Sequence, residues 1–367
     1  MKTERRKNAR LPITELAALI ESDIKSRRLT SGDPYLGLSE TARMLKTSNA
    51  GANSALQLLV KKGVLERKQR RGTFISEPGN EDAQLIRRVH FLLNEDFLKK
   101  EGVLADGQVI GIQSVLSRAE IQFNFLPQHD QREYVEKTVN EALGTEGLDA
   151  FVLYSTSLDA QRILVESGLP TVVVGSLYPS ITELPWIDQD QQAVARISFE
   201  HLHLEKQCQQ FLVLMRERAY PGDFLYLDSL QECFWKHKIS QKNIYYRSLP
   251  SDASAIQAEV SRLLPQFQST VGIIARSMPL GIAAKASLNH QQYQLHKNVF
   301  MMVTNVFGKE REELRDFAYI RPQPTPEEVG IYIGKVLKQF VLDGFSGNAA
   351  WQIPIKLIAA QQSAPAE

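Results

Sequence analysis

The sequence predicts a mixed α/β protein with a small basic domain at its start and a larger body of two lobes, each a doubly wound parallel sheet. Two patterns carry this prediction. The first 76 residues show three helical repeats and a hairpin, whereas the rest alternates short apolar strands with helices. A length of 367 residues also leaves room for two or three separate hydrophobic cores.

Charge is unevenly distributed along the chain, although the net charge is only +1. Residues 1–78 contain 16 Lys and Arg but only 8 Asp and Glu. The remaining residues contain 27 Lys and Arg and 34 Asp and Glu. A basic segment of this size favours contact with the phosphates of nucleic acid, while the acidic remainder does not.

Several classes of protein are disfavoured by what the sequence lacks. Cys208 and Cys233 have no CxxC spacing, so we expect free thiols in a reducing cytoplasm, with no disulfide framework or zinc site. No apolar run approaches 18 residues, so we expect no membrane span. His201 and His203 would not share a helix face, and no HExxH, GxSxG, Walker or GxGxxG motif occurs. We therefore expect no catalytic residue, metal or cofactor.

The basic domain begins with three predicted helices. The first is expected over 14–28 from apolar residues at helical spacing, namely Ile13, Leu16, Ile20 and Ile24. Ser39 is predicted to cap a second helix and Ser48 a third, which ends at Gly63.

A hairpin follows these helices. Strands are expected at 64–68 and 73–76, joined by Gln69-Arg70-Arg71-Gly72. Three helices and a basic hairpin are the parts of a winged helix-turn-helix, which we assign to residues 1–76. The polar, Pro-Gly-containing residues 77–85 are predicted to be a linker.

The body is assigned to residues 86–358, and 359–367 to a disordered tail. Strands of the first lobe are expected at 88–93, 121–126, 150–154 and 171–174, and those of the second at 211–215, 244–247, 271–275 and 300–303. The second series starts with a helix over 191–204. A long helix over 326–342 and one terminal strand over 351–357 complete the body. The Gly107-x-x-x-Gly111 spacing indicates helix packing only.

The first domain resembles the DNA-binding domain of the GntR family. The motifs that support this resemblance are Leu29-Thr30-Ser31-Gly32-Asp33, Thr41-Ala42-x-x-Leu45, the Ser48 cap, Ala55-Leu56-Gln57-Leu58-Leu59 before Gly63-Val64-Leu65, and Arg71-Gly72-Thr73-Phe74-Ile75. The resemblance implies that the third helix inserts into the major groove of operator DNA. This chain departs from the family at Leu36-Gly37-Leu38-Ser39, at Asn49, where an arginine is common, and at Arg70, in place of the first wing glycine.

The outward face of the third helix offers candidate base contacts. Asn49 and Asn53 can each bond adenine bidentately, although both can also be ordinary polar surface residues. Arg43 and the Ser48 helix terminus are expected at phosphates, as are Lys46, Lys61 and Lys62. The wing would bring Arg70, Arg71 and Thr73 to the duplex, with the arginines in a minor groove or on phosphates.

The body is similar to the effector domain of LacI/GalR regulators, which has the fold of periplasmic binding proteins. The segments that support this similarity are 168–175 (Gly-Leu-Pro-Thr-Val-Val-Val-Gly), 187–194 (Ile-Asp-Gln-Asp-Gln-Gln-Ala-Val), His201-Leu202 at the end of the helix expected over 191–204, and Arg321-Pro322-Gln323-Pro324. A GntR-type head on such a body is the arabinose-repressor-like arrangement. Arg276-Ser277 stands where the family has Asn-Asp, and no residue of 225–230 matches its sugar-clamping arginine.

Ligands of open α/β sheets bind outside the carboxyl ends of the strands. This rule gives the candidate effector-binding residues Asn94, Tyr154, Ser176, Arg276 and Asn305. Arg276 suits a carboxylate or phosphate, which favours a sugar-derived anion as effector. The alternative is that Arg276 forms a salt bridge across the lobes.

These observations predict a cytoplasmic, homodimeric transcriptional regulator that binds duplex operator DNA and responds to a small-molecule effector, a sugar or a sugar-derived anion. A repressor is expected. Two alternatives stay open: a sensor body that has lost its ligand and serves only to dimerise, and an enzyme tethered to DNA.

Overall fold

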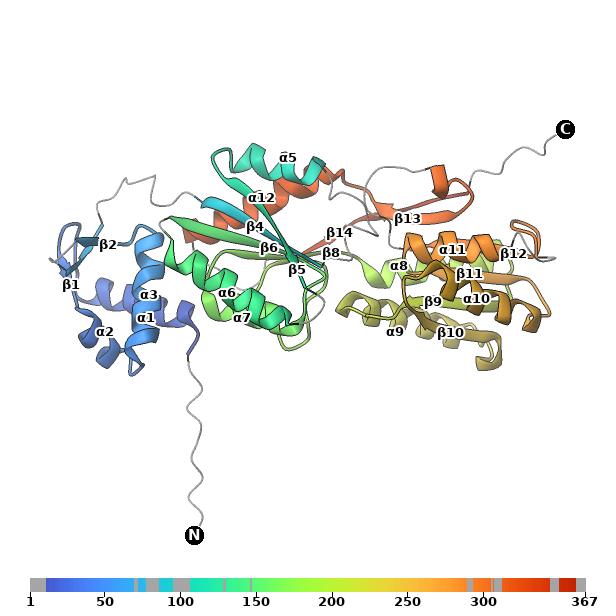
Figure 1. The fold of residues 1–367 in the computed structure, drawn as a ribbon, viewed down its shortest axis with the longest axis horizontal. Coiled ribbons are helices and arrows are strands. Elements are labelled where there is room, and N and C mark those ends of the chain that lie inside the picture. Colours follow the sequence, from blue (N-terminus) through green and yellow to red (C-terminus); the bar gives the residue numbers. More distant parts are fainter. Residues whose placement is uncertain are drawn as a thin grey trace, which may run out of the picture.

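The structure, a computed structural model, has three parts in a row (Figure 1): a helical head, a first lobe and a second lobe. It describes residues 11–68, 72–76, 86–94, 106–127, 130–145, 147–288, 293–304, 306, 312–343 and 350–360. The predicted linker 77–85 lies outside the described residues, as does 361–367 of the predicted tail.

The head contains the three predicted helices and the predicted hairpin. Its elements are α1 (Ile13–Ser26), β1 (Pro34–Tyr35), α2 (Leu38–Met44), α3 (Asn49–Lys61), β2 (Leu65–Lys68) and β3 (Gly72–Ile75). The strands form an antiparallel sheet in the order β1-β3-β2. Leu16, Ile20, Leu56 and Leu59 are fully buried where α1 and α3 pack together, so the helical periodicity of the sequence defines the core.

The two predicted helix caps have different outcomes. Ser48 caps α3 as predicted, since its Oγ accepts a hydrogen bond from the Gly51 amide at 3.2 Å. Ser39 is not the cap of α2, because the helix already begins at Leu38. Gly37 holds the cap position there, and the Glu40 carboxylate accepts from the Gly37 amide at 2.9 Å.

The first lobe is a six-stranded parallel sheet with the order β14-β8-β7-β6-β4-β5. Its strands are β4 (Ile86–Asn94), β5 (Glu120–Leu126), β6 (Leu148–Tyr154), β7 (Thr171–Val174), β8 (Trp186–Gln189) and β14 (Ala350–Ile353). Helices α6 (Gln131–Gly144) and α7 (Leu158–Ser167) lie on one side, and α5 (Asp106–Val115) and α12 (Pro326–Asp343) on the other (Figure 1). The core strand β6 is buried along its whole length, as expected for a sheet covered on both faces.

Glycines let α5 and α12 approach closely, which confirms that Gly107 and Gly111 mark helix packing. A Cβ atom on Gly111 would lie 2.1 Å from the Glu327 carbonyl oxygen, and one on Gly330 would lie 2.1 Å from that of Gln108. Only a residue without a side chain fits at either position. The helix after the first strand of the lobe is thereby held against the last helix of the chain.

The second lobe has a six-stranded sheet in the order β10-β9-β11-β12-β13-β15. Its elements are α8 (Gln191–Phe199), β9 (Gln210–Arg216), α9 (Pro221–Lys236), β10 (Ile244–Leu249), α10 (Ala253–Leu263), β11 (Val271–Ala275), α11 (Met278–Leu288), β12 (Val299–Val303), β13 (Ala318–Pro322) and β15 (Ile355–Ile358). Val213 packs with the α8/α9 side, and its neighbours Leu212 and Leu214 pack with the α10/α11 side. Alternate residues of each strand thus fill two cores, which confirms a second doubly wound lobe.

Two predicted elements are corrected by the structure. The helix expected over 191–204 is α-helical only to Phe199, and 200–205 continue as a π-helix. The single terminal strand expected over 351–357 is two strands, because Pro354 lies between β14 in the first lobe and β15 in the second. A proline amide cannot continue a sheet ladder, so the chain changes sheets at this residue.

The chain passes between the lobes three times. It crosses at Asp190, between β8 and α8, at 323–325, between β13 and α12, and at Pro354. Because the first sheet is parallel, the carboxyl ends of β4, β6 and β7 lie on one edge, where the candidate effector residues were expected.

The head rests directly on the first lobe. Helix α1 contacts α7, and α3 contacts α6. At this contact a Cβ atom on Gly168, the left-handed C-cap of α7, would lie 2.8 Å from Thr14 Cγ2 and 3.0 Å from Leu58 Cδ2. The end of α7 therefore lies against both α1 and α3.

Candidate DNA-binding face and effector site

The solvent-facing side of α3 presents the asparagines proposed to read bases. Asn49 is exposed in the first turn, and Asn53 is half-buried one turn later. The Arg67 guanidinium on β2 donates from Nη2 to Asn53 Oδ1 at 2.9 Å. The Asn53 amide is thus oriented with its oxygen toward the wing strand, while Asn49 projects freely into solvent.

The other candidate DNA contacts differ in their exposure. Arg43 and Lys46 are exposed at the end of α2 and in the turn before α3. Thr73 is buried, with 8% of its surface exposed, so its side chain faces the head interior. Burial lowers the pKa of Lys62 despite the nearby Glu21 carboxylate. Arg70 and Arg71 lie outside the described residues.

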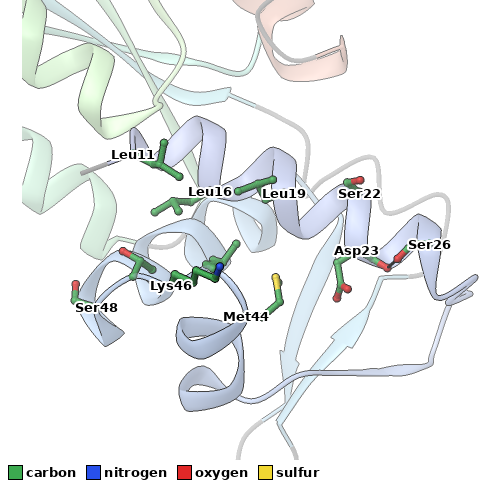
Figure 2. Close-up of a pocket in the computed structure, with 11 residues that line it drawn as sticks. Leu11, Leu16, Leu19, Ser22, Asp23, Ser26, Met44, Lys46 and Ser48 are labelled. Carbon is green, nitrogen blue, oxygen red and sulfur yellow. Dashed lines mark hydrogen bonds between the residues drawn. The ribbon is translucent and has the colours of Figure 1, made fainter. Parts of the chain in front are cut away.

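A hollow of about 740 Å³ lies beside the start of α3. Figure 2 shows Leu11, which precedes α1, and Leu16 and Leu19 of α1 on one side, with Met44 at the end of α2 and Lys46 and Ser48 of the α2–α3 turn on the other. The turn carrying Lys46 and Ser48 is therefore open to solvent on the side toward α1.

Of the four candidate effector residues that the structure describes, three lie near the place where the lobes meet. Asn94 Nδ2 donates across the lobes to the Tyr220 hydroxyl at 3.1 Å, and Ser176 donates to Asp188. Tyr154 is instead buried against Phe91 and donates to Gln108 of α5. Asn305 lies outside the described residues. We call the region around Asn94, Tyr178, Arg216, Arg218 and Tyr220 the interlobe junction.

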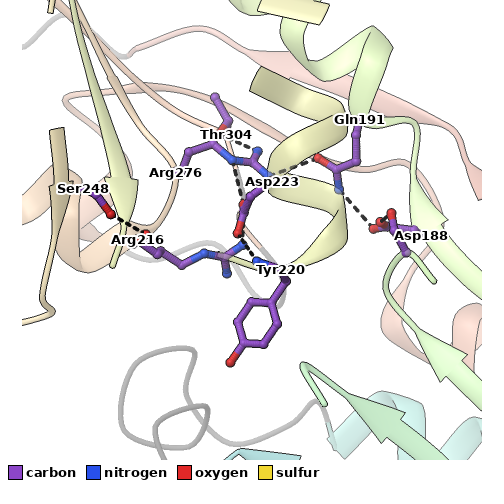
Figure 3. Close-up of polar contacts among 9 residues, drawn as sticks. Asp188, Gln191, Arg216, Tyr220, Asp223, Ser248, Arg276 and Thr304 are labelled. Carbon is purple, nitrogen blue, oxygen red and sulfur yellow. Dashed lines mark hydrogen bonds and ion pairs between the residues drawn. The ribbon is translucent and has the colours of Figure 1, made fainter. Parts of the chain in front are cut away.

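Arg276 is fully engaged inside the second lobe. Only 1% of its surface is exposed, and its guanidinium bonds to Asp223 Oδ1 at 2.8 Å, to Thr304 Oγ1 at 3.0 Å and to Gln191 Oε1 at 3.2 Å (Figure 3). It also lies 4.1 Å from the centroid of the Tyr226 ring. Arg276 does form a salt bridge, but its partner belongs to the same lobe and not to the opposite one.

Asp223, in the first turn of α9, is shared by two arginines. Its Oδ1 accepts from Arg276 and, at 2.7 Å, from Arg216, while Oδ2 accepts from the Tyr220 amide at 3.0 Å. Burial disfavours its charge, but the two guanidinium groups outweigh burial and lower its pKa to about 2. One carboxylate thus balances only one of two positive charges.

A chain of polar contacts joins the first lobe to Arg276. Ser176 donates to Asp188, whose other oxygen accepts from Gln191 at 3.1 Å, and Gln191 in turn accepts from Arg276 (Figure 3). Burial raises the pKa of Asp188, although its three hydrogen-bond donors act in the opposite direction. Ser176 and Arg276, predicted from separate strands, are therefore connected.

Four residues of this site were missed in the sequence. Arg216 ends β9 and lies at the same carboxyl edge as Arg276, so the strand-end rule applied to it as well. Arg218 and Tyr220 follow in the same loop, and Arg218 bonds Gln131 of the first lobe at 3.3 Å. No local sequence pattern indicates that Asp223 pairs with Arg276, because the two residues are 53 positions apart.

Two features are absent from the described residues. No group of three or more His, Cys, Asp or Glu side chains is placed to hold a metal ion there. In that part of the chain, no helix combines the length and apolar character needed to cross a membrane.

Comparisons with known proteins relate the two parts to different families. Residues 12–75 match the family described as bacterial regulatory proteins, gntR family. No match was found among curated protein sequences. The matched solved structures include transcriptional regulators, and five of these have 16% identity or less to this chain.

Three of these structures illustrate the relation. The transcriptional regulator CelR in complex with cellobiose has a TM-score of 0.63 and 14% identity, over 90% of this chain and all of that one. A probable maltose operon repressor, malR, from Staphylococcus aureus has a TM-score of 0.63 and 13% identity, over 76% and 98% of the two chains. A LacI-family regulator from Enterococcus faecium with bound ribose has a TM-score of 0.59 and 13% identity, over 77% and 100%. Residues 12–75 are therefore a GntR-family helix-turn-helix domain, and the lobes that follow have the fold of LacI-family regulators.

Proposed function

We propose that this protein is a cytoplasmic, homodimeric transcriptional regulator that binds operator DNA through α3 and responds to a small-molecule effector between its lobes. The observation that carries the proposal is the GntR-family head, with Asn49 and Asn53 on the outer face of α3, seated on a body with a LacI-family fold. The head supplies affinity for DNA, and the lobes supply the response.

A sugar or sugar-derived effector is supported by the structural relatives, which include complexes with cellobiose and ribose. In this chain, Asn94–Tyr220 and Gln131–Arg218 hold the lobes together directly. An effector that bonds these groups in only one arrangement of the lobes shifts the population toward that arrangement. As a repressor, the protein would bind its operator without effector and release it when effector binds.

A dimer is supported by an apolar edge on the first lobe. Among the described strands, β5 pairs only with β4, and Phe123 and Phe125 on it are 43% and 40% exposed. Ile110 on the adjoining helix α5 is 52% exposed. An edge strand with exposed aromatic residues favours pairing with a second copy, which would present two heads to two half-sites.

Selection of bound duplexes from a random pool, followed by binding titrations with the full-length protein, tests the proposal. We expect selection of a two-fold symmetric site. Affinity should fall steeply with salt, with a slope of about −0.9 in log K against log salt for each phosphate neutralised. An affinity that does not change with salt concentration, or no enrichment of any sequence, would contradict DNA recognition by the head.

Three substitutions assign roles within the head. Asn49→Ala and Asn53→Ala should each change preference at one base pair by about 1–3 kcal/mol. Arg43→Ala should lower the affinity for all DNA sequences alike, because a phosphate contact carries no sequence information. Unchanged base preferences in both asparagine variants would assign base reading to other residues.

A further inference from the structure

Positive charge is concentrated in the first ten residues of the chain. Their one acidic residue is Glu4, and their basic residues are Lys2, Arg5, Arg6, Lys7 and Arg10. These ten residues supply a net charge of +4, which is half of the net charge of +8 carried by residues 1–78. Runs of Lys and Arg of this kind bind the phosphates of nucleic acid. We call residues 2–10 the basic segment, and the structure describes the chain from Leu11 onward.

The basic segment joins the head beside the start of α3. Leu11, the residue that follows it, lies on one side of the hollow in the head, and Lys46 and Ser48 lie on the other (Figure 2). Ser48 is the cap of α3, whose first turn carries Asn49. The first turn of a helix inserted in the major groove contacts base edges, between the phosphates that border the groove. A duplex bound by Asn49 would therefore pass close to the point where the basic segment joins Leu11.

The basic segment is long enough to reach phosphates beyond the groove that α3 would occupy. Nine residues span at most about 30 Å, at ~3.4 Å per residue. One turn of duplex DNA measures about 34 Å, and the duplex carries one negative charge for about every 1.7 Å of its axis. Several phosphates thus lie within the maximum reach of the segment from Leu11.

Acidic residues near this point do not cancel the charge of the basic segment. Asp23, at the far end of the hollow, pairs with Arg27 at 2.8 Å and accepts from the Tyr35 hydroxyl at 3.0 Å. Glu15 is exposed in the first turn of α1, where a carboxylate complements the helix dipole. With Glu15 included, residues 1–15 still carry a net charge of +3. The positive charge is therefore available to an anionic partner.

We propose that the basic segment is a second DNA contact of the head, in which Arg5, Arg6 and Lys7 bind phosphates next to the site that α3 reads. The inference rests on the proposed operator binding and adds a contact that neither α3 nor the wing provides. It contributes affinity and not base preference, because phosphates are alike at every base pair. Arginine and lysine serve equally at this contact, since each neutralises one phosphate.

Operator titrations of the full-length protein at several salt concentrations test this contact. The glutamine variant Arg5→Gln/Arg6→Gln/Lys7→Gln loses three positive charges. Its slope of log K against log salt should be about 2.7 less negative than that of the wild type, because each phosphate contact contributes about −0.9. The affinity at low salt should fall more than tenfold, and the base preferences obtained by selection should not change.

Lys236→Gln/Lys238→Gln/Lys242→Gln is the matched control for net charge. It removes the same number of charges from exposed residues at the end of α9 and just after it, in the lobe farthest from the head (Figure 1). This variant should keep the slope of the wild type. Arg5→Lys/Arg6→Lys retains the charges of the basic segment and should also bind as the wild type does.

The results separate this contact from the proposed function. A glutamine variant with the wild-type slope overturns the inference, and so does an equal change of slope in the charge control. Altered base preferences in the glutamine variant would also overturn it, because a phosphate contact does not read sequence. A wild type that binds no duplex at all refutes the proposed function and this contact together, whereas a wild type that binds, with an unchanged slope in the glutamine variant, refutes the contact alone.

Discussion

At the scale of single residues, Asp223 organises the second-lobe side of the junction. It is 1% exposed and accepts from Arg216, Arg276 and the Tyr220 amide. A buried ion pair adds little relative to apolar packing, but removing one partner leaves the others charged and unpaired. The stability of this lobe is therefore more sensitive to Asp223 than to any exposed acid on α9.

Asp223→Asn should destabilise the second lobe by about 3 kcal/mol at pH 7, the cost of breaking a buried pair. The Asp223 pKa is about 2 in the folded protein and near 3.8 when unfolded, so its contribution is present above about pH 4 and lost as the pH falls toward 2. Urea unfolding at several pH values gives the free energy of unfolding of wild type and variant. The difference between the two should decrease by about 1 kcal/mol from pH 5 to pH 3. Exposed Asp228→Asn is the control, and a gap that is the same at every pH would contradict the ion-pair role.

The Arg67–Asn53 hydrogen bond leads to a prediction about base preference. While Arg67 occupies Asn53 Oδ1, the amide offers only N–H donors, which match N7 of both purines. Arg67→Ala frees the oxygen for the bidentate contact with adenine. Selection with this variant should replace a purine preference at one position by adenine, at some cost in total affinity.

Lys68→Ala is the control for this change, since Lys68 lies on the same strand but pairs with Glu66. It should weaken binding without altering preference. Identical selected sequences for wild type and Arg67→Ala would show that the bond does not orient Asn53 on DNA.

Sequence reasoning located strand-end residues but not their partners. The rule that ligand sites lie at carboxyl ends of strands brought Asn94, Ser176 and Arg276 to the junction. It did not reveal that Tyr220 meets Asn94, because the two are 126 residues apart, nor that Tyr154 turns toward α5. Such pairs depend on how two lobes pack, and no local pattern contains that information.

At the scale of elements, the α5–α12 contact depends on the absence of side chains. Gly330→Ala would place a methyl group 2.1 Å from a backbone carbonyl, which cannot move as a flexible side chain can. We expect a loss of about 1–3 kcal/mol in the unfolding free energy of the first lobe. Gly144→Ala, at the end of α6, meets nothing within 4 Å and should be neutral or slightly stabilising. Equal melting temperatures for the two variants would mean that the helices separate at little cost.

Elements were predicted best where periodicity alone defines them. Strands β7 (Thr171–Val174) and β11 (Val271–Ala275) occur as predicted, because fully buried strands are continuous apolar runs. The π-helix after Phe199 was not predicted, since its apolar spacing also fits an α-helix. The division at Pro354 was readable in principle, because proline interrupts a strand.

At the scale of the whole molecule, the contact beneath Gly168 fixes the head relative to the first lobe. Gly168→Ala adds a methyl group against Thr14 and Leu58 and also strains a backbone with φ of 68°. We expect faster hydrogen exchange in α1 and α7 as the head lifts from the lobe. Gly32→Ala separates the two effects, since Gly32 has φ of 83° but no atom within 4 Å. If both variants exchange alike in α7, the head is not held by this contact.

The glycine contact between α5 and α12 also bears on the order in which a newly made chain can fold. The head is one continuous stretch, and the second lobe is continuous from Gln191 to Pro322 apart from its edge strand β15. The first lobe, in contrast, needs residues 86–189 together with α12 and β14 from the last part of the chain. During synthesis from the amino terminus, the sheet that follows the head must wait until α12 and β14 emerge, with one face covered only by α5 and one edge strand missing. The first lobe is thus completed only after the second lobe has been synthesised, and a chain cut before α12 would retain a head whose supporting lobe cannot close.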